Sequence, residues 1–447
     1  MESSLDTLID SVLQKQTFSE EAKRQTEWVI ADTVAAALYG VKSENELLKY
    51  IRNISREKQS DSAQIPVLGT NVSSSVKDNL IIHGTAIVSN ELDEGNTFAK
   101  GHPSAHIFPT LFAVAWENKA DIDSVIMAYI KAYEISSRFA NAAKMYDKLH
   151  PHGTWGNAGG AVAKALIEGK TKKEIKQIIL LTLSLPLTTS WLAAEEGQKV
   201  RNLYTGLGSF FAYEATNLVD YGFASNISVT QHLWSDILGE GFEEERLYKS
   251  LFNPPMIQQN YMKKHPACRF THAAIDAAEL IRNENDIDPL SIKKITVDTY
   301  NLAARCDVQI PKSKLQAKFS IPYAVACTLM GKNMFENYQE NLFFVKKLAE
   351  KIVVNDTQWI TDMLPQKRAA NVTIEMKDGH SISRLVENAK GEYFDALREQ
   401  DLWIKYENML SQYYSDAWLK NLKENLLNMR NHSTFAEWVL ANKLIER

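Results

Sequence analysis

The sequence predicts a mainly α-helical protein in which a smaller α+β domain is inserted into a large helical domain. Helical periodicity with capping signals recurs through the first 250 residues. After about residue 262, SIKKITVDTY alternates as a strand does, and AANVTIEMKDGHSISRLVE has the pattern of a β-hairpin turning at Asp378-Gly379. We therefore expect the helical domain at 1–262, the α+β domain at 263–395, and helices at 396–447 that rejoin the first domain.

The helices of the first domain carry recognisable start and stop signals. The segment FSEEAKRQTEWVIADTVAAALYG has Ser19 as a candidate N-cap, acidic residues in its first turn and Gly40 at its end. Thr171 and Glu174 stand in capping-box spacing. Other segments, such as IILLTLSLPL, are apolar around most of their circumference, which is typical of central helices. The expected helices are 18–40, 74–92, 104–118, 121–143, 155–168 and 171–184.

The composition is that of an ordinary globular chain, with 447 residues, 45% hydrophobic and 23% charged. A net charge of -5 and the absence of a long basic block argue against a nucleic-acid partner. No stretch is long and apolar enough for a membrane span, and the N-terminus has no basic start or apolar core. Cys268, Cys306 and Cys327 stand far apart in sequence, so we expect a reducing, cytoplasmic location.

The stretch ELDEGNTFAKGHPSAHIFPTL, residues 91 to 111, has the composition of an active-site loop. It holds Asp93, Thr97, His102 and His106 between two apolar segments. An Asp can orient a neighbour, a Thr can bond a carboxylate, and a His can move a proton near neutral pH. Asp, Asn, Gly and Pro are also ordinary turn residues, so a structural loop is the alternative.

Further polar clusters follow along the chain. His150 and His152 precede a Gly-rich helix entry in LHPHGTWGNAGGAVAKA, and Lys199 and Arg201 precede a helix start that could help to hold an anion. The alternative for Lys199 and Arg201 is a solvated charged turn. A later cluster lies at the domain junction and consists of Lys263, Lys264, His265, Arg269 and His272. The last candidate is Tyr323 in the apolar segment AKFSIPYAVA, where the alternative is a tyrosine of the hydrophobic core.

Two chemical interpretations of these clusters are open. His102 and His106 stand four apart, as metal ligands on a helix do, but the glutamate of an HExxH motif is missing and Pro103 favours a loop. We therefore expect no metal. The combination of His with Lys, Arg, Thr and Tyr instead describes a pocket for a small polycarboxylate, where cations hold the carboxylates and a neutral His removes a carbon-bound proton.

In their common order, these clusters resemble the MmgE/PrpD family, which includes 2-methylcitrate dehydratases and cis-aconitate decarboxylases. The most specific parts are LDEGNT with GHPS, HPHGTWGNAGGA, VRNLYTG, KKHPACRFTHAAID and AKFSIPYAVA. The resemblance implies a helical domain built from both chain ends, a smaller α+β lid, and a homodimer. It also implies an active site between the domains that needs no metal or organic cofactor.

The resemblance also assigns roles to residues. His102 matches the catalytic histidine of the family and His150 its second active-site histidine, while Arg201 stands where decarboxylases carry lysine and so puts that reaction in doubt. His106 and His152 have no fixed counterpart. The remaining expected site residues are Asp93 and Thr97 of the acidic loop, the active-site Tyr323, and Lys263 as a substrate-binding lysine, with Lys199 and Lys264 as further anion-binding candidates.

The resulting expectation is a cofactor-independent lyase that eliminates water from a small di- or tricarboxylate. Lys263 and Arg201 would hold carboxylates, His102 and His150 would share the proton transfers, Asp93 would set one tautomer, and Tyr323 would shield or donate. Decarboxylation, epimerisation or isomerisation of a dicarboxylate, and non-catalytic carboxylate binding are the alternatives.

Overall fold

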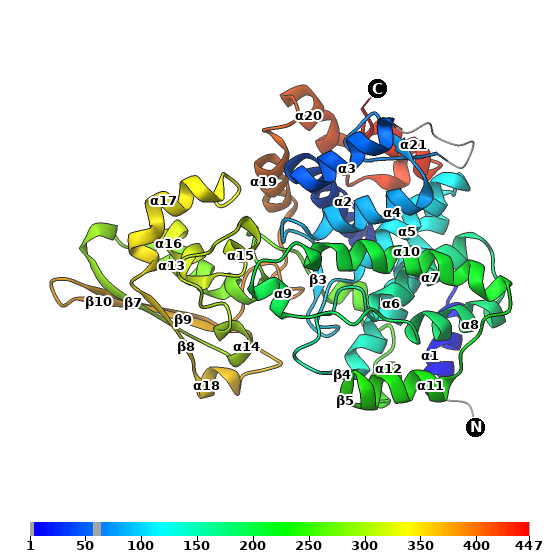
Figure 1. Cartoon of the computed structure of the whole chain (residues 1–447), viewed down its shortest axis with the longest axis horizontal. Helices are drawn as coiled ribbons and strands as arrows, with labels where there is room; N and C mark the ends of the chain where they lie inside the picture. The colour runs from blue at the N-terminus through cyan, green and yellow to red at the C-terminus, as the bar shows by residue number, and fades with distance from the viewer. Residues whose placement is uncertain (1–3, 57–63, 447) are drawn as a thin grey trace.

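The computed structural model describes residues 4–56 and 64–446 and is mainly helical, as predicted. Figure 1 shows the larger, helical part on one side and a smaller part built around a sheet on the other. The longer helices of the larger part up to residue 262 are α1 (Ser4–Gln14), α2 (Glu20–Ser43), α3 (Asn45–Arg56), α4 (Val76–Val88), α5 (Pro103–Glu117), α6 (Ile122–Ala142), α7 (Gly156–Ile167), α8 (Lys172–Leu183) and α10 (Val200–Asp220).

Short elements connect these helices. The helical ones are α9 (Leu192–Glu195), α11 (Ile227–His232), a π-helical turn at Leu233–Ile237, α12 (Glu245–Tyr248) and a 3₁₀ turn at Met256–Gln259. The strands form three antiparallel pairs, which are β1 (Ile65–Pro66) with β2 (Ser73–Ser74), β3 (Gly95–Asn96) with β6 (Asn260–Tyr261), and β4 (Ala143–Met145) with β5 (Gly239–Phe242).

The smaller part contains a four-stranded sheet of order β10-β9-β7-β8. Strands β7 (Ile292–Thr299), β9 (Ala370–Met376) and β10 (Ser381–Val386) are antiparallel neighbours, and β8 (Ile352–Asp356) runs parallel to β7. Its helices are α13 (His272–Glu284), α14 (Asn301–Ala304), α15 (Lys314–Ala317), α16 (Ile321–Leu329), α17 (Tyr338–Ala349) and α18 (Gln358–Thr361), with 3₁₀ turns at Arg269–Thr271 and Pro289–Ser291.

The predicted local elements are found close to their expected bounds. Helix α13 covers the predicted HAAIDAAELIRNE, and β9 and β10 form the predicted hairpin, with Gly379 at φ +91° in its turn. The parallel strand β8 was not predicted, because its sequence IVVND is short and carries no alternation of its own. The second neighbour of β7 therefore comes from a long-range pairing that local pattern does not encode.

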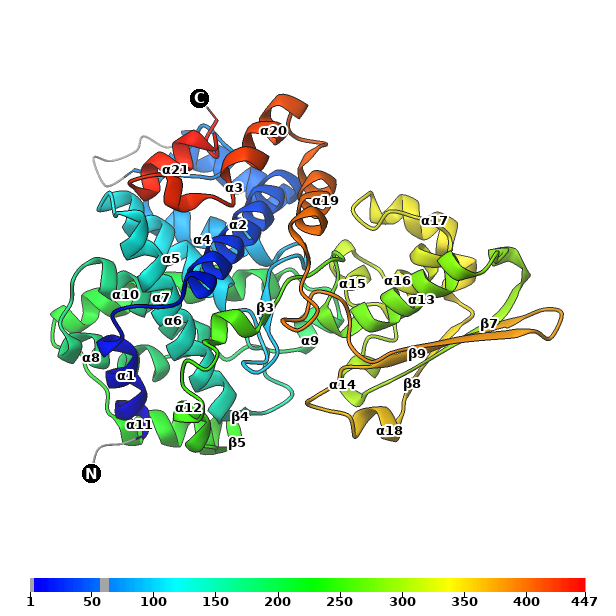
Figure 2. The ribbon, with the colours of Figure 1, turned by 180° about the vertical axis from the view of Figure 1, so that it is seen from behind.

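The C-terminal helices return to the helical part. They are α19 (Glu399–Leu410), α20 (Asp416–Asn425) and α21 (Phe435–Ala441), with a 3₁₀ turn at Met429–Asn431 between the last two. Figure 2 shows α19 beside α2 and α21 near α5. Leu402, Tyr406, Phe435 and Trp438 join the large hydrophobic core of the first chain segment. A separate core lies between the sheet and α13 and α16, and no described helix is long and apolar enough to cross a membrane.

Helix α10 packs unusually close to α4 because glycines face each other. A Cβ on Gly84 would lie 2.7 Å from Cα of Gly206, and a Cβ on Gly206 would lie 2.6 Å from the carbonyl oxygen of Ile81. Only glycine leaves room for such backbone approach. This crossing brings the first turn of α10, and with it Arg201, against the end of α4, where the loop that holds Asp93 and His102 begins.

Substituting Gly206 by Ala should destabilise the protein by about 1–3 kcal/mol, since overpacking outweighs the gain of about 1 kcal/mol in helix propensity. The measurement is urea unfolding followed by circular dichroism. Tyr221→Ala, at the 81% exposed C-cap of the same helix, is the control and should change stability by less than about 0.5 kcal/mol. If Gly206→Ala left the free energy of unfolding unchanged or raised it, α4 and α10 would be able to accommodate an added methyl group at their crossing.

Candidate active site

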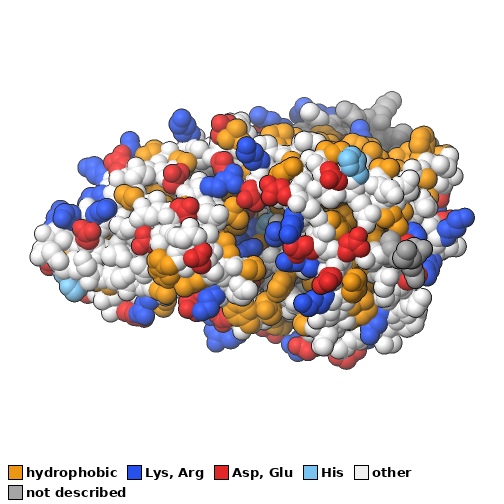
Figure 3. Space-filling view, turned by 90° about the horizontal axis from the view of Figure 1, so that it is seen from below, with side chains coloured by type: hydrophobic (Ala, Val, Ile, Leu, Met, Phe, Trp, Pro, Cys, Tyr) orange, Lys and Arg blue, Asp and Glu red, His pale blue; other side chains and the backbone are white. Residues whose placement is uncertain are grey.

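A cavity of about 420 Å³ lies between the helical part and the sheet-containing part. Figure 3 shows a hollow between the two parts with Lys and Arg side chains at its edge. The helical part contributes His102, His150 and Trp191, whereas Phe270 and Phe319 come from the other side. A cavity of this size that combines apolar walls with a few polar groups is typical of a small-molecule site.

The loop between α4 and α5 is fixed by a short strand pairing. Gly95 and Asn96 in β3 pair with Tyr261 and Asn260 in β6, which brings residues 91–93 beside the segment that follows β6. The side chain of Asn96 accepts hydrogen bonds from the backbone N–H groups of Phe98 and Ala99 at 3.0 Å. A polar loop that would otherwise be mobile is thus held by its own side chains.

Four buried charges meet at the start of this loop. Arg201 on α10 forms an ion pair with Glu91, and Lys263 Nζ lies 3.0 Å from Glu91 Oε2 and 3.5 Å from Asp93 Oδ1. None of the four side chains is more than 2% exposed. We call Glu91, Asp93, Arg201 and Lys263 the charge cluster; its two cations and two anions balance, which is the condition under which buried charges are tolerated.

The pKa values in the charge cluster follow from this balance. Burial alone would raise the pKa of Glu91, but Arg201 and Lys263 outweigh it and lower that pKa. The pKa of Asp93 is likewise held far below its usual range by His102 and Lys263 against the effect of burial. Burial lowers the pKa of Lys263, but Asp93 and Glu91 reverse this and raise it. All of these groups are therefore charged at neutral pH.

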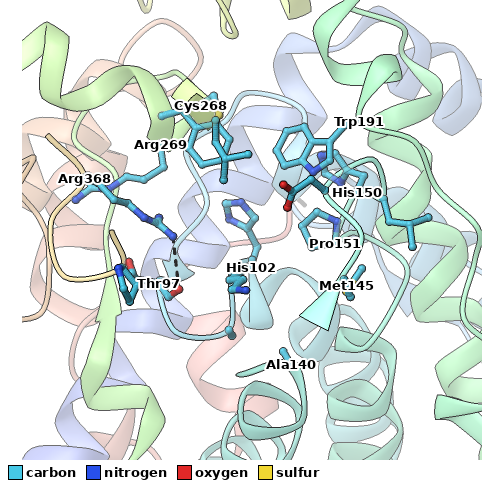
Figure 4. Close-up of a pocket in the computed structure, with 18 of the residues that line it drawn as sticks. Thr97, His102, Ala140, Met145, His150, Pro151, Trp191, Cys268, Arg269 and Arg368 are labelled. Atoms are coloured by element: carbon cyan, nitrogen blue, oxygen red, sulfur yellow. Dashed lines mark hydrogen bonds between the residues drawn. The ribbon is translucent and has the colours of Figure 1, made fainter. Parts of the chain in front are cut away.

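His102 stands at the N-cap of α5 and is oriented by two oxygen atoms. Its Nδ1 lies 2.8 Å from the carbonyl oxygen of Glu94 and 3.0 Å from Asp93 Oδ2. Both neighbours accept hydrogen bonds, so in the neutral ring Nδ1 carries the proton and Nε2 has a free lone pair. Figure 4 shows His102 between Thr97 and Arg368 on one side and His150 and Trp191 on the other. The arrangement suits a general base in the cavity.

His150 faces the same cavity from the loop before α7. Its Nδ1 lies 3.2 Å from the backbone nitrogen of His152, so this ring nitrogen faces an N–H donor. The Nε–H of Arg201 faces Nε2 as a second donor at 3.4 Å, and Trp191 packs on the ring with centroids 4.4 Å apart. Burial and the charge of Arg201 lower the pKa of His150 well below its usual value. His150 is therefore a neutral ring that both neighbours approach with N–H groups.

The other two histidines lie behind the cavity. His106 donates from Nδ1 to the carbonyl oxygen of His102 at 2.9 Å and accepts at Nε2 from the backbone N–H of Gly153 at the same distance, so both ring nitrogens hold the scaffold together. Burial lowers the pKa of His106 to about 4. His152 is fully buried, and its ring lies 5.1 Å from that of His102 and 4.5 Å from that of His150.

The remaining sequence-predicted site residues fall into two groups. Thr97 lines the cavity, and its Oγ1 donates to Glu392 at 3.3 Å. Lys199 is 56% exposed and pairs with Glu46, and Lys264 pairs with Glu279 outside this cavity. Tyr323 is buried in the second hydrophobic core on α16, an almost wholly apolar helix, and does not line the cavity. The structure thus does not bring Lys199, Lys264 and Tyr323 to the other site residues.

Arg201 lies at the cavity, but its partner differs from the one that the sequence suggested. Its guanidinium already holds Glu91, the carbonyl oxygen of Val88 at 2.9 Å and Asn202 Oδ1 at 3.3 Å. We expected it to bind a substrate carboxylate. In the structure a protein carboxylate takes that place, because Glu91 stands at φ +53° and directs its side chain to α10.

Sequence reasoning passed over several cavity residues. Glu91 belongs to the acidic run ELDEG, so its carboxylate could have been suspected as a partner for the nearby cations. Arg368 lies in QKRAAN before β9, where no local pattern distinguishes it from a surface arginine. Its guanidinium donates to the carbonyl oxygen of Thr97 at 3.5 Å, and no described residue forms an ion pair with it. Tyr300 also lines the cavity, and its buried hydroxyl has no hydrogen-bond partner among the residues that the structure describes.

One group of side chains is spaced closely enough to bind a metal ion. One ligand atom from each of Asp93, His102 and His152 lies within 4.8 Å of the others. However, Asp93 already contacts Lys263 and His102, and His102 Nδ1 is committed to the Glu94 carbonyl oxygen. A divalent ion there would also face the buried cations Arg201 and Lys263. These residues fit proton transfer better than metal binding.

Two family models match most of the chain. The model of the MmgE/PrpD N-terminal domain matches residues 11–242, and that of the MmgE/PrpD C-terminal domain matches residues 265–427. The chain belongs to the MmgE/PrpD family. A search of curated proteins found no significant match. Membership of the MmgE/PrpD family, which the sequence motifs predicted, supports an enzyme with lyase-like or dehydratase-like activity in general terms.

Replacing Arg201 by Ala should destabilise the protein by about 3–5 kcal/mol, because Glu91 would remain buried with one cation fewer. Urea unfolding is the measurement. Lys199→Ala, two residues earlier in an exposed ion pair, should cost no more than about 1 kcal/mol. Equal losses in the two variants would mean that Arg201 is not a structural member of the charge cluster.

Glu94 should make stability depend on pH. Burial raises its pKa from 4.5 to about 7, although Ser104 and Tyr133 hydrogen-bond its carboxylate. The folded state therefore holds this proton more tightly than the unfolded state, so wild-type stability falls as pH rises from 4.5 to 7. Glu94→Gln should lack this fall, which is on the order of 3 kcal/mol.

The check is urea unfolding of wild type and Glu94→Gln at matched pH values across that window. Subtracting the two curves removes the contribution of every other titrating group. A stability difference that stays constant with pH would show that the Glu94 carboxyl ionises as it does in the unfolded chain.

Proposed function

We propose that this protein is a cofactor-independent lyase that removes water from a small di- or tricarboxylate of the citrate or 2-methylcitrate kind. The observation that carries the proposal is the orientation of His102, whose protonated Nδ1 leaves Nε2 as a base at the cavity wall. Family membership supports the reaction class. The free, buried cysteines agree with a reducing, cytoplasmic location.

Arg368 is the best-placed anchor for a substrate carboxylate. Arg269 and Arg305 also line the cavity, but they are paired with Glu392 and Glu195. Arg368 offers a planar fork that is free of protein carboxylates, on the Thr97 side of His102. A guanidinium binds a carboxylate through two charge-assisted hydrogen bonds, which fixes orientation as well as charge.

The elimination would run through His102. Nε2 takes the proton from the carbon next to a bound carboxylate, the C–H electron pair becomes the C=C bond, and the hydroxyl leaves with the proton that the imidazolium of His102 returns as acid. Ionised Asp93 stabilises that imidazolium, as the carboxylate does in other His–Asp pairs. Neutral His150 lines the cavity rather than acting as the acid, because burial and the charge of Arg201 lower its pKa.

The part with its own sheet core would serve as a lid domain, with 263–395 as its extent and 1–262 with 396–447 as the helical domain. Phe270, Phe319 and Tyr300 cover the side of the cavity opposite His102 and His150. Closure of such a cover excludes water and strengthens electrostatic interactions with the substrate.

A homodimer is supported by an apolar stripe on α10. Val200, Leu203, Leu207 and Phe211 are 37–49% exposed and recur every three or four residues on the face opposite Arg201 and Thr205. Figure 1 shows α10 lying across the surface of the helical part. An exposed apolar stripe of this length is typical of a protein interface.

The reaction is tested by incubating the pure protein with tricarboxylates and hydroxydicarboxylates and following mass loss. Loss of water from one substrate, persisting after exhaustive chelation, supports the proposal. Loss of CO2 would indicate a decarboxylase, and deuterium uptake from solvent without mass loss an epimerase. Binding without any turnover would reduce the protein to a carboxylate-binding role.

His102→Asn should lower kcat on the best substrate by roughly 100- to 10,000-fold, because the amide keeps the size but cannot take the proton. His232→Asn, at a 69% exposed histidine, is the matched control and should leave kcat unchanged. Turnover close to wild type in His102→Asn would assign the proton transfer to another group.

Leu203→Glu should convert the dimer into monomers, since it places a charge in the α10 stripe. Light scattering after size-exclusion chromatography gives the mass of each species. Leu290→Glu, at a 75% exposed position in the sheet-containing part, should remain dimeric. A dimeric Leu203→Glu variant would show that the interface lies elsewhere. A monomeric wild-type protein would show that there is no dimer interface.

A further inference from the structure

A second cavity of about 340 Å³ lies on the other side of residues 263–265 from the active site. Its walls come from α13, from the segment that follows α16, and from α19 of the helical part. In Figure 2, α19 lies on the side of the helical part that faces α13 and α17. A ligand in this cavity would therefore contact both parts of the molecule.

The second cavity is cationic in a chain whose net charge is -5. Only Glu279 and Asp401 contribute carboxylates to its lining. The cationic side chains of the lining are Lys264, Arg282, Lys332, Lys390 and Lys405. A concave surface with such an excess of one charge concentrates ions of the other sign.

Two of these cations are available to a ligand. Arg282 donates to the carbonyl oxygen of Thr328 at 2.8 Å, and Lys332 lies 3.8 Å from the centre of the Phe344 ring. Among the described residues, neither forms an ion pair. Lys390 is held only loosely by Asp401, at 3.8 Å. An anion with several oxygen atoms could contact all three without displacing a short ion pair.

The second cavity is also connected to the active site. Lys405 donates to Asp32 at 2.5 Å and to the carbonyl oxygen of Leu92 at 2.8 Å, directly before Asp93. Lys264 follows Lys263, which holds Glu91 and Asp93. Movement of either cavity lysine would thus reach the loop that carries His102.

We propose that the second cavity binds a small polyanion, a polycarboxylate or a phosphate compound, that joins α13 and the segment after α16 to α19. Binding there holds the two parts of the molecule together and stabilises the loop at residues 91–93. This site is distinct from the proposed substrate cavity, and its occupancy does not depend on the reaction that the protein performs.

The test is titration calorimetry of the full chain, at about 0.1 M salt, with tricarballylate and with inorganic pyrophosphate as probes. Arg282→Gln combined with Lys332→Gln should weaken binding by about tenfold or more, while Arg368→Gln, in the first cavity, should leave this binding component in place. Lys293→Gln combined with Lys294→Gln removes two charges elsewhere on the same part and should bind as wild type does.

Both cavity substitutions lie at partly exposed positions, and the melting temperature without probe checks that the variant is folded. Binding of pyrophosphate alone would indicate a phosphate compound, and binding of tricarballylate alone a polycarboxylate. The proposal is overturned if neither probe binds, if the cavity variant binds as wild type does, or if the Lys293 and Lys294 variant loses as much affinity.

Discussion

The buried charge cluster of Glu91, Asp93, Arg201 and Lys263 is the interaction on which the site depends. Removing each of these charges from water costs several kcal/mol, so the cluster is stable only while its members remain together. They come from the loop after α4, from α10 and from the segment after β6. The cluster therefore fixes three distant segments relative to one another, and misplacing any one of them leaves an unpaired buried charge.

This constraint decides the chemistry of His102. Because Lys263 keeps Asp93 ionised and in place, an acceptor always lies beside Nδ1 of His102. The carbonyl oxygen of Glu94 lies beside the same nitrogen, so both neighbours favour one tautomer. Arg201 acts in two ways, since it neutralises Glu91 and, after burial, its charge further lowers the pKa of His150. The tautomer of His102 and the neutral state of His150 thus depend on burial and on one arrangement of charges.

The sequence predicted what is local or carried by motifs. Helix α13 and the β9–β10 hairpin have their signals within the segment itself, and His102, His150 and Lys263 lie in motifs whose order identified the family. It did not predict that Arg201 pairs with Glu91, because that contact depends on the glycine crossing of α4 and α10. It also did not show that Tyr323 points into the second core, since an apolar helix gives no sign of which side faces a cavity.

The central claim is that the protein, before substrate binds, holds His102 with its proton on Nδ1 and a free Nε2. Nuclear magnetic resonance of protein labelled with ¹⁵N in its histidine rings measures this directly, with the His102→Asn variant assigning the signal. The structure predicts that the neutral His102 ring carries its proton on Nδ1 and not on Nε2, and that this balance shifts in Asp93→Asn. A His102 ring protonated on Nε2 alone in the wild-type protein would contradict the account.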